Sequence, residues 1–141
     1  MRLANRLSPL WAAVLAAPLI AHAAVAQPPV GIHKTTLQEI AFPAPLHTLT
    51  VRTLVDPGVE VAPHTHSGVE MGYVVSGTAQ VTVRGAAPKQ IGRDGSFVIP
   101  PGAVHWVKNV GPRRLTIVST FIVDPTKPIA SPAAGAAPAT R

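Results

Sequence analysis

One segment of this sequence raises the main question: GVEVAPHTHSGVEMGYVVSG, residues 58–77. It places His64, His66 and Glu70 within seven consecutive positions, although the chain has only six histidines and six acidic residues. A polar turn between two strands would explain the cluster without any function. Side chains alternate faces along a strand, however, so His64 and His66 point the same way, and Ser67-Gly68 can turn the chain before Glu70. The segment therefore predicts a hairpin presenting two imidazoles and a carboxylate, a plausible half-shell for a divalent ion.

A further candidate ligand, His105, lies far along the chain. It follows the rigid turn Pro100-Pro101-Gly102 and shares a strand face with Val107 and Asn109. Neutral imidazoles and a carboxylate suit Mn, Fe, Co, Ni or Zn, and the chain has no cysteine to add a thiolate. An octahedral ion with four such ligands keeps two positions for water, substrate or oxygen. The sequence thus favours one divalent transition-metal ion without naming the metal.

The rest of the sequence predicts an all-β fold. Prolines and glycines recur at short intervals, and the segments between them carry β-branched residues without a 3.6-residue apolar repeat. Many short strands with turn signals between them are typical of a sandwich or closed barrel. The expected strands are residues 46–55, 69–75, 78–84, 96–99, 104–108 and 115–123.

Two motifs resemble those of the cupin superfamily. The spacing G-x5-H-x-H-x3-E-x6-G, which looks like the first cupin motif, is present without departure at Gly58, His64, His66, Glu70 and Gly77. The spacing P-x-G-x2-H-x3-N, which resembles the second, is present at Pro100, Gly102, His105 and Asn109. Asp94 replaces the glycine that usually precedes the second motif, a departure that affects the local turn and leaves the ligand untouched.

The resemblance carries expectations about fold, ligands and activity. It implies a double-stranded β-helix, or jelly-roll barrel, with the metal inside its mouth, and it implies that homodimers are common among such small members. The metal ligands that it implies are His64, His66, Glu70 and His105. By resemblance the leading function is a metal-dependent, dioxygenase-like enzyme, with isomerase or lyase chemistry also open. The alternative is a non-catalytic cupin that binds a metal or a small ligand.

The candidate catalytic residue is Glu70. A carboxylate can change the way it binds a metal, and it is a base in its own right. Apolar walls are expected from Val74 and Val107, with Phe97 or Ile99 as further candidates. Such walls favour a small, weakly polar or aromatic substrate.

Four other positions bear on the pocket. Gly72 shares the strand face of Glu70 and is expected to leave open space beside it. Trp106 and Tyr73 alternate out of phase with the ligands, so both are expected to point away from the metal. The strand that contains Arg52 does not reveal its inner side, and an inward Arg52 that anchors a substrate carboxylate is left open.

Both ends of the chain are expected to lie outside the barrel. Residues 1–26 combine a basic start, an apolar run and small residues, which is typical of a cleaved signal peptide and predicts a periplasmic or secreted protein. Cleavage after Ala23 is one alternative; an uncleaved membrane anchor is another, disfavoured because the apolar run is shorter than about 20 residues. The expected remaining divisions are an extended arm over 27–44, a cupin domain over 45–124 and a disordered Pro/Ala-rich tail over 125–141.

The charge of the chain argues against nucleic-acid binding. Without Arg2 and Arg6 of the expected signal, ten Lys and Arg face six Asp and Glu, and these cations are spread along the chain without clusters. The absence of cysteine excludes disulfide bonds. The expected partners are a small-molecule substrate or ligand and a second copy of the chain, with no nucleic acid and no membrane after signal cleavage.

Overall fold

The structure is a computed structural model that describes residues 30–134. The described residues form ten β-strands and no helix. In chain order the strands are β1 (Ile32–Ile40), β2 (His47–Val55), β3 (Glu60–Thr65), β4 (Val69–Ser76), β5 (Ala79–Val83), β6 (Lys89–Ile91), β7 (Ser96–Ile99), β8 (His105–Asn109), β9 (Leu115–Val123) and β10 (Ser131–Pro132). The six strands expected from the sequence are all present, each within one residue of its expected ends.

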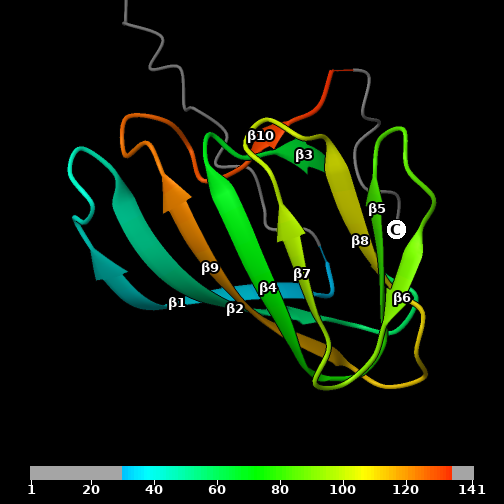
Figure 1. Cartoon of the computed structure of the whole chain (residues 1–141). Helices are drawn as coiled ribbons and strands as arrows, with labels where there is room; N and C mark the ends of the chain where they lie inside the picture. Colours follow the sequence, from blue (N-terminus) through cyan, green and yellow to red (C-terminus); the bar gives the residue numbers. More distant parts are fainter. Residues whose placement is uncertain (1–29, 135–141) are drawn as a thin grey trace, which may run out of the picture.

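Two five-stranded antiparallel sheets make up the fold. Their strand orders are β1-β2-β9-β4-β7 and β10-β3-β8-β5-β6. Figure 1 shows the first sheet on the left and the second on the right, with β10 beside β3 at the top. From β2 to β10 the chain crosses from one sheet to the other after every strand except β5, which forms a hairpin with β6. This winding confirms the expected all-β jelly roll.

Strict alternation along the central strands fills the space between the sheets. In β9 the inward residues Leu115, Ile117, Ser119, Phe121 and Val123 are all buried, and the intervening residues are half-buried. Alternation of this kind places every second side chain on one face. Ser119 is the polar exception in an apolar row, and it lies opposite Gly72 of β4. The row that β9 presents to the interior is therefore apolar except at Ser119.

The N-terminal arm expected over residues 27–44 is partly wrong. Residues Ile32–Ile40 are extended as expected, but they pair antiparallel with β2 along their whole length and belong to the first sheet. Nearly all of β1 is exposed, because it is an edge strand with no neighbour on its outer side. The prolines that suggested a free arm lie outside the strand, so they do not interrupt its backbone pairing.

The disordered tail expected over residues 125–141 is wrong for residues 125–134. Ser131 and Pro132 pair with Thr65 and His64 of β3, and Ala133 is buried. Backbone hydrogen bonds hold this segment, which explains why its low apolar content did not predict it. Residues 135–141 and the expected signal peptide lie outside the described residues. In the described part no helix is long and apolar enough to cross a membrane.

The single departure near the second motif, Asp94, and the motif residue Asn109 both have structural roles. Asp94 has a φ of 65°, the left-handed conformation that glycine adopts freely and aspartate tolerates better than most residues. The Tyr73 hydroxyl donates a hydrogen bond of 2.7 Å to Asp94 Oδ1, so the turn is kept despite the missing glycine. Asn109 is fully buried and donates to the carbonyls of Val55 and Arg113 at 2.9 and 2.8 Å. It closes the loop before β9 and does not reach the metal ligands.

Candidate metal centre

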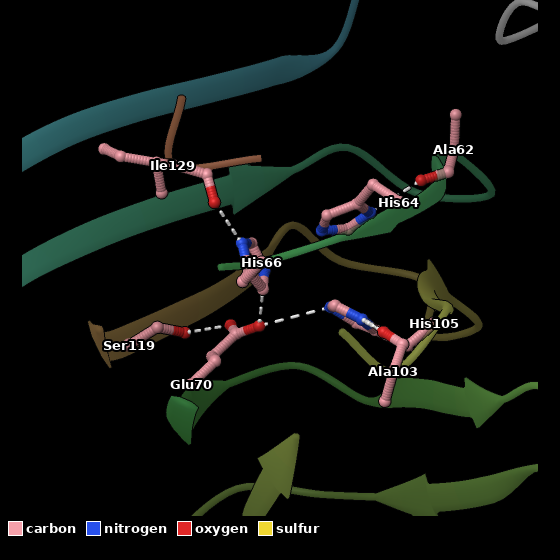
Figure 2. A network of polar contacts seen from close by, with 8 residues as sticks. All are labelled: Ala62, His64, His66, Glu70, Ala103, His105, Ser119 and Ile129. Atoms are coloured by element: carbon pink, nitrogen blue, oxygen red, sulfur yellow. Dashed lines mark hydrogen bonds and ion pairs between the residues drawn. The ribbon is translucent and has the colours of Figure 1, made fainter. Parts of the chain in front are cut away.

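Three histidines and one glutamate from both sheets converge between them. His64 is on β3, His66 follows its end, Glu70 is on β4 and His105 begins β8, where it pairs with His64. The three imidazole ring centres are 4.3 to 5.0 Å apart, and one ligand nitrogen from each lies within 4.8 Å of the others. Figure 2 shows the Glu70 carboxylate below the His66 ring and beside the His105 ring. The three histidines are close enough to share one metal ion.

Each imidazole is oriented by a backbone carbonyl. Nδ1 of His64 donates to the Ala62 carbonyl at 2.7 Å, and Nδ1 of His105 donates to the Ala103 carbonyl at 3.0 Å. Nδ1 of His66 donates to the carbonyl of Ile129. A carbonyl only accepts, so each ring must carry its proton on Nδ1. The three Nε2 lone pairs are left for the cavity, the arrangement usual for metal-binding histidines.

The contacts of Glu70 test whether a cation fits here. Its Oε2 lies 3.1 Å from Nε2 of His66 and 3.2 Å from Nε2 of His105, and the latter nitrogen is buried without a hydrogen bond. With neutral rings these are lone pairs facing a carboxylate, which repel unless positive charge lies between them. Ligand atoms about 2.1 Å from one ion lie about 3.0 Å apart at a right angle. The separations therefore fit a shared metal ion.

Glu70 is ionised in this site although it is only 7% exposed. Burial by itself would raise the pKa of its carboxyl group. Positive charge between the carboxylate and the Nε2 atoms of His105 and His66, together with a hydrogen bond from Ser119, outweighs burial and holds the pKa far below its ordinary value. The Ser119 hydroxyl donates to Glu70 Oε1 at 2.7 Å. One carboxylate oxygen is thus held by β9, and the other faces the imidazoles.

His64 stays neutral at ordinary pH. Burial lowers the pKa of its imidazole to about 4, although the hydrogen bond to Ala62 opposes this shift. A metal binds the neutral imidazole, so a low pKa keeps the ring in its ligand form.

The cavity in front of the ligands is small and mostly apolar. Its free volume is about 30 Å³. Two of the four predicted wall residues, Val107 and Phe97, line it, while Val74 and Ile99 are buried in the core instead. The full lining comprises the four candidate ligands with Lys34, Thr53, Val61, Phe97, Val107, Ile117, Ser119 and Phe121.

The expectation that Gly72 leaves open space beside Glu70 is wrong. A Cβ atom at Gly72 would lie 2.1 Å from Cζ of Phe97 and under 2.6 Å from two further ring carbons. The space that glycine provides is therefore filled by an aromatic ring from β7. Gly72 is required for Phe97 to form the wall of the cavity.

The three remaining positions considered in the sequence, Arg52, Tyr73 and Trp106, do not line the metal cavity. Arg52 is exposed on β2, and its neighbour Thr53 lines the cavity, so the open alternative of an inward Arg52 does not hold. Tyr73 is 44% exposed and bonded to Asp94, as its phase predicts. Trp106 is half-buried and does not line the metal cavity, also in agreement with its phase.

Sequence reasoning missed three contributors to the site. Ser119 could have been found as the polar interruption of the apolar alternation in residues 115–123. Lys34, at the cavity, lies in the segment that was expected to be a free arm. The carbonyl of Ile129 lies in the segment that was expected to be disordered, and no side-chain pattern marks a backbone acceptor.

Comparisons with known proteins agree with this geometry. The cupin domain model matches residues 51–121, which include all four candidate ligands. Germin-like protein subfamily T member 3 of Arabidopsis thaliana is 37% identical over 102 residues, which cover 64% of this chain and 44% of that protein. H2HPP isomerase of Bacillus subtilis is 29% identical over 89 residues, which cover 52% of this chain and 38% of that protein. The chain thus spans less than half the length of these curated relatives.

A solved structure is also similar to this chain in its fold. Oxalate oxidase in complex with the substrate analogue glycolate superposes with a TM-score of 0.60 at 26% identity, covering 74% of this chain and 56% of that one. The family model matches half of the 141 residues and spans both histidine motifs. On this evidence the chain belongs to the cupin family.

Proposed function

We propose that this protein is a metal-dependent cupin enzyme, dioxygenase-like in chemistry, that acts on a small, weakly polar or aromatic substrate. The observation that carries the proposal is the convergence of three Nε2 lone pairs and an ionised carboxylate on one buried point. A divalent ion bound there supplies a Lewis acid for a substrate oxygen, or holds the substrate beside dioxygen. The proposed ligands are His64, His66, Glu70 and His105.

Glu70 is the proposed catalytic residue as well as a ligand. Its low pKa keeps the carboxylate ionised at neutral pH, which is the form that binds a cation. A carboxylate that loosens from the ion could then act as the base. The Ser119 hydroxyl holds Oε1 at 2.7 Å, so the carboxylate can release its other oxygen without leaving the site. A second acid or base is not found among the described residues around the cavity, apart from Lys34 on β1.

The walls support an apolar substrate. The free volume of about 30 Å³ near the ligands admits only a few substrate atoms, since a single water needs about 10 to 15 Å³. Phe97 also lines a second cavity of about 190 Å³, together with residues that include Val81, Ile91 and Ile99. A cavity of about 150 Å³ holds a benzene ring. Phe97 is therefore shared by the metal site and by a cavity large enough for an aromatic group.

The relatives support an enzyme without selecting its reaction. One similar structure is an oxalate oxidase, and one similar protein carries the name of an isomerase. Cupins therefore include enzymes of different reaction classes, and a shared fold does not choose between them.

Oxygen consumption tests the proposal. Protein loaded separately with Fe²⁺, Mn²⁺, Co²⁺ or Ni²⁺ is mixed with a panel of small phenols and aromatic acids, and dissolved oxygen is followed. Turnover by the wild type that is lost in Glu70→Gln supports the enzyme. Turnover that persists in Glu70→Gln removes Glu70 from the mechanism.

The second candidate function is a non-catalytic cupin that binds a metal or a small ligand. Apart from Lys34, the described residues around the cavity provide no acid or base besides the candidate ligands, and this favours a binding protein. Metal binding with no oxygen consumption and no product formation across the same panel would decide for the binder.

A further inference from the structure

The chain beyond β9 does not leave the barrel but returns to the metal site. We call residues 124–134 the C-terminal strap. It begins in a turn closed by Asp124, whose Oδ1 accepts hydrogen bonds from the backbone N–H and the hydroxyl of Thr126 at 2.9 and 2.6 Å. The backbone N–H of Asp124 also donates to Oγ of Ser67 at 3.2 Å, beside His66. The turn therefore starts the strap next to a candidate ligand.

The far end of the strap is held by β3. Ser131 and Pro132 pair with Thr65 and His64, and the N–H of Ala133 donates to the Pro63 carbonyl at 3.0 Å. Ala133 is buried. Between these two anchors the carbonyl of Ile129 accepts the Nδ1 proton of His66, as Figure 2 shows.

His66 differs from the other two histidines in the origin of its acceptor. His64 and His105 each use a carbonyl two residues earlier in their own strand, so these bonds form with the strand itself. The acceptor for His66 lies 63 residues later in the chain. Phe121 also contacts the ring edge-on, with centroids 4.9 Å apart, but a hydrophobic contact does not choose which nitrogen carries the proton. Glu70 lies at Nε2, so among the contacts of His66 the strap provides the acceptor that holds a proton on Nδ1.

We infer that the C-terminal strap positions His66 and thereby sets the metal affinity of the site. With the strap docked, the proton of His66 is held on Nδ1 and its Nε2 faces Glu70 at 3.1 Å. Without it, the buried ring loses the acceptor that fixes its tautomer and its orientation. Loss of such a contact typically weakens metal binding about 10- to 100-fold. The inference rests on the proposed metal site.

The coupling between strap and metal is reciprocal. If docking of the strap strengthens metal binding, metal binding must stabilise the docked strap by the same factor. The amide of Ala133 reports this state, because its N–H bonds to Pro63 only while the strap is docked. Bound metal is expected to slow hydrogen exchange at Ser131 and Ala133 more than in the β1–β2 hairpin, which carries none of the candidate ligands.

Two matched pairs of variants test the inference with Co²⁺ as the probe. Asp124→Ala removes the acceptor of the turn, whereas Asp124→Asn keeps an oxygen for Thr126. Ala133→Pro removes the N–H that bonds to Pro63. The control Ala134→Pro changes the exposed residue that follows and keeps the N–H of Ala133. Co²⁺ affinity is measured by competition with a chelator, together with the Co²⁺ absorption spectrum and the melting of the metal-free protein.

The expected result is a Co²⁺ affinity at least about 10-fold weaker in Asp124→Ala and Ala133→Pro, with near wild-type values in their partners. The inference is overturned if Co²⁺ affinity and spectrum stay unchanged while hydrogen exchange shows the strap undocked. If one variant does not fold, the other pair decides. A wild-type protein that binds no Co²⁺ would instead refute the metal site, so the two failures are distinguishable.

Discussion

Three imidazole rings in this protein each donate their Nδ1 proton to a backbone carbonyl, which leaves three Nε2 lone pairs for the cavity. Opposite them Glu70 is ionised and held by Ser119. At the scale of single residues the site is thus a set of lone pairs with no positive charge among them. Predictions at this scale concern the ligands and their protonation.

Replacing His64 and His66 together with alanine is expected to abolish metal binding, because the two remaining ligands cannot hold an ion tightly. Elemental analysis after dialysis should fall from about one ion per chain to near zero. His47→Ala is the matched control, since His47 contacts Glu39 on the edge of the sheet and lies outside the histidine cluster. Near-full occupancy in the double variant would remove the site assignment.

The low pKa of His64 predicts acid sensitivity of the metal-free protein. Burial lowers this pKa to about 4 from an ordinary value of about 6.5. Between these values the unfolded chain takes up a proton that the folded protein does not, so the free energy of unfolding falls as pH falls from about 6.5 toward 4. Denaturant unfolding across this pH range should show a shallower fall in His64→Gln. An NMR titration of the His64 ring near pH 6.5 would contradict the prediction.

At the scale of strands, β4 and β7 shape the cavity between them. Gly72 of β4 lies opposite Phe97 of β7, and the absent side chain of one makes room for the ring of the other. β1, near the start of the described chain, contributes Lys34 to the cavity lining. β10, near its end, pairs with β3 at His64. The site thus depends on pairs of strands and not on one motif.

Gly72→Ala is expected to destabilise the protein by about 1 to 3 kcal/mol, because the new Cβ displaces the Phe97 ring. Gly92→Ala is the control, since a Cβ there meets no atom within 4 Å. Unfolding by urea measures both. The double variant Gly72→Ala with Phe97→Ala should show a smaller cost than the sum of its two single variants, because the clash is gone. Additive costs would contradict a direct contact between the two positions.

At the scale of the whole molecule, the candidate metal ligands come from both sheets, so a metal bound there would join them. His64 and His105 come from one sheet, and Glu70 comes from the other. A ligand that binds only the folded state stabilises it by mass action. The chain has no cysteine, so no disulfide bond adds to the stability of the folded state.

Removing the metal is therefore expected to lower the melting temperature. At a free metal concentration about 1,000 times its Kd, the bound ion contributes about 4 kcal/mol. Calorimetry before and after dialysis against a chelator measures the shift, and re-addition of metal should restore it. The His64→Ala, His66→Ala double variant should not respond to either treatment. An unchanged wild-type melting curve would argue against a tightly bound ion.

Much of this molecule could be predicted from local patterns. The six expected strands lie within one residue of their expected ends, because alternation and turn residues act over a few neighbouring positions. The spacing of His64, His66 and Glu70 likewise requires only the alternation of a strand and one short turn. Two of the expectations that failed, for residues 32–40 and 125–134, concern edge strands whose pairing partners lie elsewhere in the chain. A third, the open space at Gly72, failed because Phe97 of another strand fills it.

The sequence by itself determined the strand pattern, the cupin motifs and the kinds of side chain offered to a metal, since each follows from neighbouring residues. Only the tertiary structure decided that Phe97 fills the space at Gly72, that Ser119 holds Glu70, and that the C-terminal strap orients His66. These are contacts between segments far apart in the chain. A backbone carbonyl is chemically the same at every residue, so its choice as the partner of a buried imidazole leaves no mark in the order of the amino acids.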